Sequence, residues 1–179
     1  MRKLVSYMLV SVDGVAQDPE TFLFDFDEVM DANLGEVIGT QDTVLLGRRM
    51  YDEWSRYWPA SEIQPFADFI NGVQKYVATS TPLATEWTNA EAITGSVETF
   101  VRELKAGDGG DIGVHGSISL TQSLLAAGLV DELRLLVAPR VVGSGRRLFQ
   151  EDLGLGLELV ESVGSPSGSL LVQYRVTGG

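Results

Sequence analysis

Two adjacent arginines, Arg48 and Arg49, follow Gly47 at the end of a short apolar run. The run predicts a buried strand over residues 43–46, so the arginines would lie in the first turn of the next helix. Free backbone N–H groups and the helix dipole attract anions there, and a guanidinium can bind a phosphate through two hydrogen bonds. The junction is therefore a candidate phosphate site, with a pair of ordinary surface charges as the alternative.

Two other predicted strands also end in residues that suit phosphate groups. Ser80 and Thr81 follow one of them, and their hydroxyl groups could bind a ribose phosphate. The triplet Gly116-Ser117-Ile118 follows the other, where a glycine lets a pyrophosphate approach the backbone N–H groups. Ordinary turn chemistry and tight strand–helix packing are the respective alternatives.

His115 is the only histidine, and the chain has no cysteine. We therefore expect no metal site, because protein metal sites usually draw on clusters of these residues. The absence of cysteine also excludes disulfides and a cysteine nucleophile. The histidine is a candidate acid–base group; the alternative is that it packs beside a bound ligand or hydrogen-bonds to the backbone.

Carboxylates gather around the first predicted helix and the strand before it. Asp13 precedes Gly14 at the expected end of the first strand, where an aspartate would also favour a turn. The helix expected over residues 22–38 carries four more: Asp25, Asp27, Glu28 and Asp31. Asp27 and Asp31 are four residues apart and would share one helix face. One of these groups could relay a proton or hold a cationic heterocycle; a solvated helix face is the alternative.

Three aromatic residues follow the arginine pair at helical spacing: Tyr51, Trp54 and Trp58. Such residues usually pack in the core, but they could instead line a pocket for a flat ring. Arg146 follows the flexible segment 143–145 and could hold a substrate phosphate; a surface loop is the alternative.

These residues must be positioned by the elements that the apolar patterns predict. Strands are expected over residues 3–12, 43–46, 75–78, 91–94, 112–115, 133–142, 157–162 and 170–176. Helices are expected over residues 22–38, 48–58, 65–73, 97–104 and 119–127, with Ser96 as an N-cap. The alternation favours a mainly parallel sheet with helices on both faces and a terminal β-hairpin at one edge. Pro139 inside a predicted strand indicates an edge, a bulge or a bend.

The composition limits the possible partners. The chain of 179 residues fits one domain and carries a formal net charge of −12 at pH 7. Such a surface repels nucleic acid and anionic lipid, and no apolar run reaches the roughly 18 residues that a membrane span needs. The first residues lack the features of a signal peptide, and the lack of cysteine fits a reducing compartment, so we expect a cytoplasmic protein.

Six short segments, in register over nearly the whole chain, resemble the dihydrofolate reductase-like superfamily. The likeness is strongest to the reductase domain of bifunctional riboflavin-biosynthesis deaminase–reductases and its stand-alone relatives. The segments are SVDGV at residues 11–15, LLGRRMY at 45–51, KYVATS at 75–80, IGVHGS at 112–117, GLVDEL at 128–133 and PRVVGSGRRLF at 139–149. The resemblance implies an α/β fold in three layers, with a mixed, mainly parallel sheet of about eight strands.

The resemblance further implies NADPH-dependent reduction of a pyrimidine- or pteridine-like heterocycle, in a protein whose relatives are often homodimers. The cofactor would be held by Gly14, Gly47, Arg48, Arg49, Ser80, Thr81, His115, Gly116, Ser117 and Ile118. The substrate would meet Tyr51, Trp54, Trp58 and Arg146, and the candidate catalytic residues are Asp13 and Asp27.

Two other functions are compatible with some of these residues. The same fold could hold a nucleotide or metabolite without turnover, because a fold does not guarantee an activity. A hydrolase fits less well, since no Gly-x-Ser-x-Gly motif occurs and a single histidine limits catalytic triads.

Overall fold

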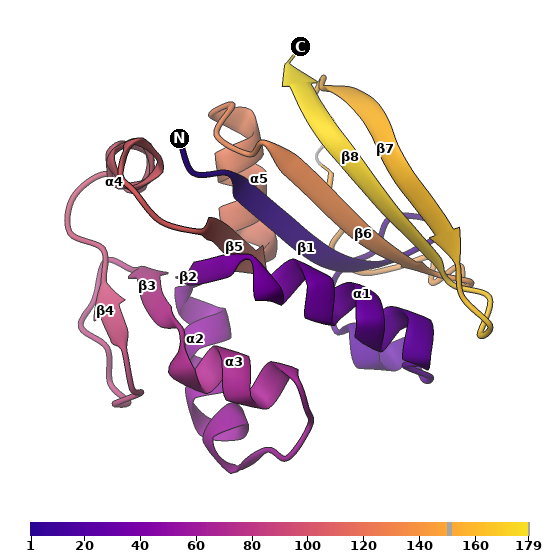
Figure 1. The fold of residues 1–179 in the computed structure, drawn as a ribbon, viewed down its shortest axis with the longest axis horizontal. Coiled ribbons are helices and arrows are strands. Elements are labelled where there is room, and N and C mark those ends of the chain that lie inside the picture. The colour runs from indigo at the N-terminus through magenta and orange to yellow at the C-terminus, as the bar shows by residue number, and fades with distance from the viewer. Residues whose placement is uncertain (150–151, 179) are drawn as a thin grey trace.

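One mixed sheet of eight strands organises the computed structural model, which describes residues 1–149 and 152–178 (Figure 1). The strands follow the order β4-β3-β2-β5-β1-β6-β8-β7 across the sheet. Neighbours from β4 to β6 are parallel, whereas β8 is antiparallel to β6 and β7. The strands are β1 Leu4–Ser11, β2 Gln41–Gly47, β3 Gln74–Ala78, β4 Ala90–Ala92, β5 Asp111–His115, β6 Glu132–Ala138, β7 Gly156–Gly164 and β8 Leu170–Gly178. The predicted fold class, a mainly parallel α/β sheet with a C-terminal hairpin, is confirmed.

Helices cover both faces of this sheet, as the alternation of elements predicts. The helices are α1 Glu28–Gly39, α2 Arg48–Tyr57, α3 Phe66–Gly72, α4 Val97–Ala106 and α5 Ile118–Ala126, with two short 3₁₀ turns, η1 Pro19–Thr21 and η2 Trp58–Ala60. Apolar clusters join α4 and α5 to one face and α1, α2 and α3 to the other. Among the described helices, none is both long enough and apolar enough to cross a membrane.

The short apolar run in β2 shows how the two layers form. Leu45 packs with residues of α4 and α5, while Val44 and Leu46 pack with residues of α2 and α3. All three side chains are fully buried, and burying each of them stabilises the fold by roughly 1.5–3 kcal/mol. A strand buried on both faces therefore appears in the sequence as a continuous apolar run.

The first helix begins later than its apolar spacing predicts, and the prediction of helix over residues 22–27 is wrong. Asp27 is the N-cap of α1, and its Oδ1 accepts hydrogen bonds from the N–H groups of Val29 and Met30, each at 3.1 Å. An N-cap residue has extended backbone angles, so the chain before it leaves the helix axis. Phe26 is therefore outside the helix and 40% exposed.

The sixth strand ends at Ala138, before Pro139, because proline cannot donate a hydrogen bond to the ladder. The following loop pairs instead with the segment after β1. The N–H of Ala16 donates to the carbonyl of Arg146 at 2.9 Å, and the N–H of Leu148 donates to the carbonyl of Gly14 at 2.9 Å. This pairing positions the segment that leads to η1 above the ends of the parallel strands.

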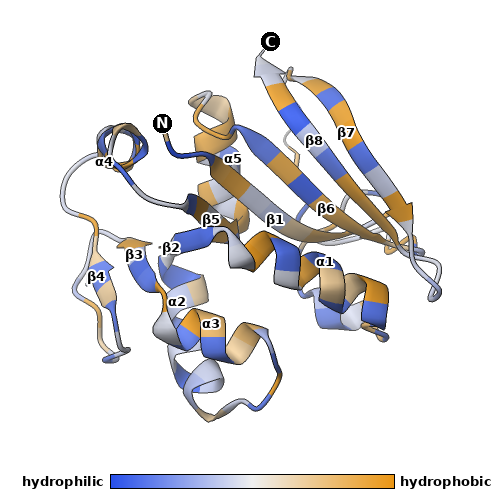
Figure 2. Ribbon diagram, in the orientation of Figure 1, coloured by the Kyte–Doolittle hydropathy of each residue, from blue (hydrophilic) through white to orange (hydrophobic). Residues whose placement is uncertain are grey.

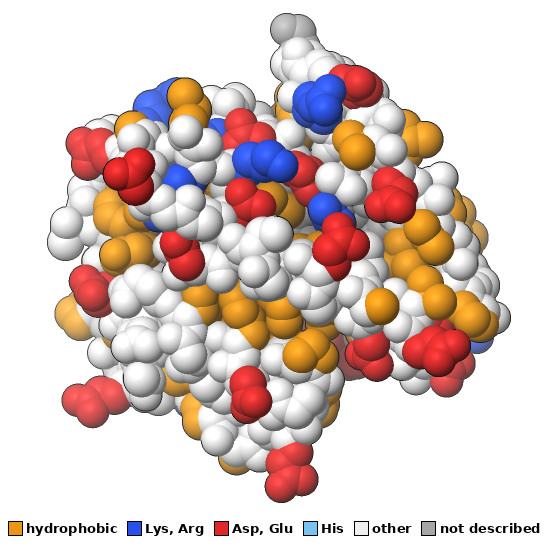
Figure 3. Space-filling model, in the orientation of Figure 1, with side chains coloured by type: hydrophobic (Ala, Val, Ile, Leu, Met, Phe, Trp, Pro, Cys, Tyr) orange, Lys and Arg blue, Asp and Glu red, His pale blue; other side chains and the backbone are white. Residues whose placement is uncertain are grey.

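The terminal hairpin of β7 and β8 lies at the edge of the sheet, and its outer strand β7 is largely exposed. Polar and apolar residues alternate along β7 and β8 (Figure 2), yet eight of the nine residues of β7 are exposed. Hydrophobic side chains gather on the flank of the molecule over this hairpin (Figure 3). They include Leu157, Leu159, Val160 and Val163.

Candidate active site

A cavity of about 800 Å³ opens beside the middle of β1 and the ends of β2 and β5, and residues of α1, α2 and the start of α5 border it. Sites for small molecules usually have volumes of roughly 300–1,000 Å³, so its size suits a ligand. Ten of the predicted site residues line it: Gly47, Arg48, Arg49, Trp54, Trp58, His115, Gly116, Ser117, Ile118 and Arg146. The other six lie outside its lining: Asp13, Gly14, Asp27, Tyr51, Ser80 and Thr81.

The start of α2 presents free N–H groups together with Arg48. Gly47 is the N-cap and offers no side chain to the first turn of the helix, so these donors remain available to an anion. The guanidinium of Arg48 lies 2.9 Å from the carboxylate of Asp52 and donates to the hydroxyl of Thr79 at 3.2 Å. It also donates to the hydroxyl of Thr81. Arg48 thus links the helix start to the loop that follows β3.

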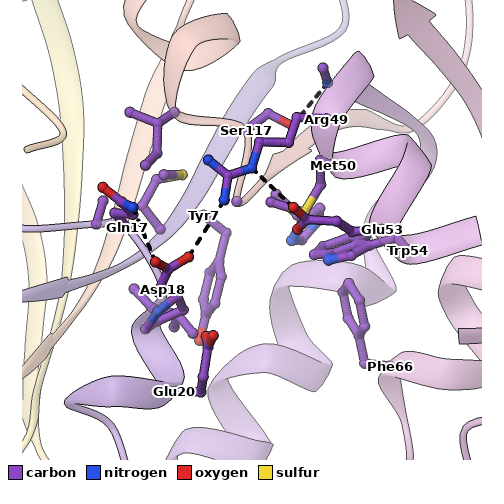
Figure 4. Close-up of a pocket in the computed structure, with 18 of the residues that line it drawn as sticks. Tyr7, Gln17, Asp18, Glu20, Arg49, Met50, Glu53, Trp54, Phe66 and Ser117 are labelled. Atoms are coloured by element: carbon purple, nitrogen blue, oxygen red, sulfur yellow. Dashed lines mark hydrogen bonds and ion pairs between the residues drawn. The ribbon is translucent and has the colours of Figure 1, made fainter. Parts of the chain in front are cut away.

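Arg49 extends across the cavity between two carboxylates. Its Nε donates to Glu53, one turn later in α2, at 3.0 Å. Its Nη2 lies 3.7 Å from Asp18, which belongs to the segment after β1 (Figure 4). The charge of Arg49 is therefore balanced within the chain.

The start of α5 is the second place with free backbone donors. Gly116 has φ +65°, a conformation that favours glycine. The hydroxyl of Ser117 accepts the N–H of Gly47 at 2.9 Å and makes no cap bond to α5. The first turn of α5, beginning at Ile118, is consequently uncapped, and the starts of α2 and α5 are tied together.

A second hollow of about 430 Å³ shares Gly47 and Arg48 with the main cavity. It reaches from the end of β3 at Ala78 to Ser96, the N-cap of α4, and the first residues of that helix. Neither Ser80 nor Thr81 lines this hollow. The hydroxyl of Thr81 accepts a hydrogen bond from Arg48, which does line it, and Ser80 is exposed on the same loop. The two hollows also share Ser119 and Leu120, so both border the starts of α2 and α5.

Aromatic rings form one wall of the main cavity. The rings of Trp54 and Trp58 pack edge-on against Phe66, with centroids 5.5 Å and 4.8 Å away. Tyr51 does not join them: it is buried in the core, and its hydroxyl donates to the carbonyl of Thr85. The expectation that Tyr51 contacts substrate therefore does not fit its position.

Asp13 fixes loops instead of facing the cavity. Its carboxylate accepts hydrogen bonds from the hydroxyl of Ser11 at 2.7 Å and from the N–H groups of Val142 at 3.0 Å and Gly143 at 2.8 Å. These bonds, led by that from Ser11, hold the pKa of Asp13 well below its usual range. Asp13 does not fit the catalytic role expected from the sequence, and the adjacent Gly14 forms the turn with φ +82°.

Asp27 is likewise committed to structure. Besides capping α1, it accepts the N–H of Ser167 from the hairpin turn at 3.0 Å. Burial alone would raise its pKa, but the hydrogen bonds, led by those from Ser167, bring it down to about 2. Asp27 is therefore an ionised N-cap and does not fit the role of a proton donor.

Four other carboxylates line the cavity: Asp18, Glu20, Asp31 and Glu53. Only Asp31 comes from the group of four that the sequence placed on the first helix. Among residues 1–149 and 152–178, no group of three His, Asp or Glu side chains is arranged to hold a metal ion.

His115 lies at the floor of the cavity and is 3% exposed. Its Nε2 is 2.8 Å from Oε1 of Gln41, and its ring packs against Tyr7 and Phe66. Burial lowers the pKa of His115 to about 4, so the imidazole is neutral near pH 7. The position matches packing beside a ligand better than acid–base chemistry.

Arg146 approaches the cavity from the loop after β6. Its Nη2 donates to the hydroxyl of Ser119 in the first turn of α5 at 2.7 Å, and its N–H donates to Oε1 of Gln17 at 3.1 Å. The guanidinium therefore lies at the uncapped helix start, which is the anion-binding end of the cavity.

Several lining residues carry no local signal in the sequence. Tyr7 is one of many apolar-patterned residues of β1, and Phe66 begins a short helix. Asp18 and Glu20 lie in a loop whose path depends on pairing with the segment near Arg146. Asp18 alone has an unusual feature, a left-handed φ of 49°, which no sequence pattern reveals.

Comparisons with known proteins show the family and the fold of this chain. The chain is 30% identical over 185 residues to the uncharacterized protein YyaP of Bacillus subtilis, covering 99% of this chain and 96% of that protein. A solved structure of a putative riboflavin biosynthesis protein from a Shewanella species has a TM-score of 0.79 at 17% identity, covering 98% and 99% of the two chains.

A dihydrofolate reductase from Enterococcus faecalis, solved in complex with NADP(H), has a TM-score of 0.61 at 16% identity, covering 98% of this chain and 96% of that one. At these identities the two solved structures establish the fold alone. Residues 2–171 match the RibD C-terminal domain family, and the chain therefore belongs to that family.

Proposed function

We propose that this protein is an oxidoreductase that binds NADPH and reduces a small pyrimidine- or pteridine-like heterocycle. The observation that carries the proposal is the hydrogen bond between Ser117 and Gly47, which brings two uncapped helix starts together at one cavity. Backbone donors at two adjacent helix starts suit a pyrophosphate. The dihydrofolate reductase with NADP(H) shares the fold, which supports the choice of cofactor.

The residues at the cavity fit the parts of the dinucleotide. Gly116 brings its backbone to the cavity lining without a side chain, and its φ of +65° turns the chain into the start of α5, where the pyrophosphate would bind. Arg48, with the hydroxyls of Thr79 and Thr81, would bind the phosphate on the adenosine ribose. The second hollow, beside Ser96, would take the adenine.

The remaining part of the cavity would hold the substrate against the aromatic wall. Bound NADPH supplies the hydride, so the protein must hold and orient a ring and exclude water. Trp54, Trp58 and Phe66 offer flat apolar surface for that purpose. The neutral His115 contributes packing, and Asp31 is the first-helix carboxylate that borders this space.

The second candidate function is a nucleotide-binding module without turnover. One observation favours it: Asp13 and Asp27, the two carboxylates expected to act as catalytic groups, are both held in structural hydrogen bonds. Substrate-dependent loss of reduced-nicotinamide absorbance distinguishes the two functions, because a module binds NADPH and never oxidises it.

The experiment that tests the proposal is calorimetric titration with NADPH and NADH. Removal of both guanidinium groups, Arg48→Ala with Arg49→Ala, should weaken NADPH binding by roughly 10- to 100-fold and abolish any preference over NADH. Arg56→Ala is the matched control, since Arg56 is exposed on the same helix and lines neither hollow. Equal affinities of all variants for both cofactors would reject the site.

We also propose a cytoplasmic homodimer. The composition and the lack of cysteine support the compartment. The exposed apolar edge strand β7 supports the dimer and offers a surface on which to test it.

A further inference from the structure

Arg48 occupies a place that Arg49 does not, because its side chain borders both hollows. The side chain of Arg48 is 29% exposed, compared with 63% for that of Arg49. The proposed function assigns the phosphate on the adenosine ribose to Arg48. The orientation of this one guanidinium therefore decides whether the protein can distinguish NADPH from NADH.

Asp52, one turn later in α2, makes the first contact that fixes this orientation. Nε of Arg48 lies 2.9 Å from each of the two carboxylate oxygens of Asp52. The side chain of Asp52 is 35% exposed and lines neither hollow. The carboxylate therefore contacts Arg48 from outside the space that a ligand would fill.

The loop after β3 makes the second set of contacts with the same guanidinium. Nη1 of Arg48 donates to the hydroxyl of Thr79 at 3.2 Å and to the hydroxyl of Thr81. It also lies 3.2 Å from the carbonyl oxygen of Thr81 and 3.0 Å from that of Pro82. All four acceptors are uncharged, so the loop orients the guanidinium without cancelling its charge.

One nitrogen of Arg48 remains available. A guanidinium has five N–H donors in one plane, of which Nε and Nη1 carry three. Nη2 carries the other two and has no hydrogen-bond or ion-pair partner among the described residues. A side chain that is already held at two nitrogens loses little conformational freedom when a ligand binds to the third, which favours binding.

We propose that Asp52 is a positioning residue for recognition of the phosphate on the adenosine ribose. It holds Nε of Arg48 so that Nη2 is presented to the phosphate, and it does not touch the ligand itself. The inference rests on the proposed function in taking a phosphorylated adenosine as the ligand at Arg48.

Positioning and simple repulsion make opposite predictions for Asp52. A carboxylate near an anionic ligand repels it, so repulsion alone predicts tighter binding when the carboxylate is removed. The Debye length is about 8 Å at about 0.15 M salt, which weakens repulsion from a partly exposed group. Loss of the Nε contact is not screened in this way, so we expect the positioning effect to be the larger.

The test is calorimetric titration, at about 0.15 M salt, with adenosine 2′,5′-bisphosphate and adenosine 5′-monophosphate, which differ only in the 2′-phosphate. The wild type should bind the bisphosphate about tenfold more tightly or better. Asp52→Asn and Asp52→Ala should weaken the bisphosphate roughly two- to tenfold, the cost of ordering one arginine side chain, and leave the monophosphate unchanged. Asp52→Glu, which keeps the carboxylate, should restore most of the affinity.

Glu36→Gln is the matched control. It also removes one negative charge and one ion pair, that with Arg134 at 3.4 Å, but Glu36 lies outside both hollows. It should leave the affinity for both probes unchanged. Exposed ion pairs contribute little to stability, so urea denaturation should show that every variant folds almost as stably as the wild type.

Two outcomes would overturn the inference. If Asp52→Asn binds the bisphosphate as tightly as the wild type or more tightly, repulsion equals or outweighs positioning. If it loses affinity for both probes equally, Asp52 maintains the shape of the helix start and has no particular role toward the 2′-phosphate.

Titration of the same proteins with NADPH separates this inference from the proposed function. If the wild type binds NADPH and Asp52→Asn does not change the preference for the 2′-phosphate, only the inference is lost. If the bisphosphate depends on Asp52 as expected but NADPH does not bind, the proposed function fails and Asp52 remains the positioning residue of an adenosine phosphate site. If the wild type binds neither NADPH nor the bisphosphate, both are overturned.

Discussion

The hydroxyl of Ser117 accepts a hydrogen bond from the backbone N–H of Gly47 at 2.9 Å. The bond joins the start of α5 to the start of α2, although 70 residues separate the two positions. Ser117 makes no side-chain cap bond to its own helix. Two sets of free N–H groups therefore face one place, where they attract an anion more strongly than either helix alone.

The first prediction concerns this serine. Ser117→Ala removes the bond and should weaken NADPH binding about tenfold, while the loss of one hydrogen bond destabilises the fold by only about 1 kcal/mol. Calorimetry measures the first effect and urea denaturation the second. Ser61→Ala, in a surface loop outside both hollows, is the control. Unchanged affinity in Ser117→Ala would show that the bond does not organise the site.

The second prediction concerns Gly116, which has φ +65°. An alanine there would strain the backbone by roughly 1–2 kcal/mol, and its Cβ would lie 2.9 Å from Cε of Met50 in the cavity lining. We expect Gly116→Ala to reduce both stability and NADPH affinity.

Gly128→Ala separates these two effects. Gly128 has φ +64°, and nothing lies within 4 Å of the Cβ position. It should lose a similar amount of stability and keep its full affinity for NADPH. If both variants lose affinity equally, backbone strain and not the cavity is responsible.

The sequence predicts most elements because their causes are local. Buried parallel strands such as β2 appear as apolar runs, and Ser96 caps α4 as expected, accepting the N–H of Thr99 at 3.3 Å. The start of α1 is the exception. The apolar spacing of α1 continues back to Phe26. The helix nevertheless begins after Asp27, because the side chain of Asp27 accepts hydrogen bonds from its first N–H groups.

The residues of the candidate site also differ in whether a local sequence pattern predicts their position. The junctions at Gly47 and Gly116 can be found in the sequence because a strand end and a helix start are neighbours in the chain. Asp18 and Glu20 cannot, because their loop is placed by pairing between residues near 16 and near 146. The structural hydrogen bonds of Asp13 and Asp27 are hidden from the sequence for a related reason, since their partners Gly143 and Ser167 lie more than 100 residues away.

The third prediction concerns the only histidine, so its ring resonances in an NMR titration need no assignment. Burial lowers the pKa of His115 from 6.5 to about 4. Between these two pH values the unfolded chain binds a proton that the folded protein does not, so stability falls as the pH drops from about 6.5 to about 4.

We expect the ring to remain neutral at pH 6 and urea denaturation to show lower stability at pH 5 than at pH 7. Part of the acid sensitivity should disappear in His115→Phe, which cannot take up a proton. A midpoint near 6.5 in the folded protein would contradict the buried position next to Gln41.

The fourth prediction concerns the edge strand β7, on which the proposed homodimer depends. A nine-residue edge strand without lysine or proline leaves its outer N–H and C=O groups open to another strand. The apolar side chains on it, such as Leu159 at 55% exposure and Val163 at 39%, would be buried by a second copy. We therefore expect the protein to sediment as a dimer at micromolar concentration.

Leu159→Lys together with Val163→Lys should convert the dimer to a monomer, because two desolvated ammonium groups oppose pairing. Val141→Lys is the control: Val141 is 76% exposed in the loop after β6. A wild-type protein that sediments as a monomer, or a dimer that survives the double substitution, would remove β7 as the interface. Because the cavity lies beside β1, β2 and β5 and its described lining includes no residue of β7 or β8, the monomeric variant should still bind NADPH with unchanged affinity.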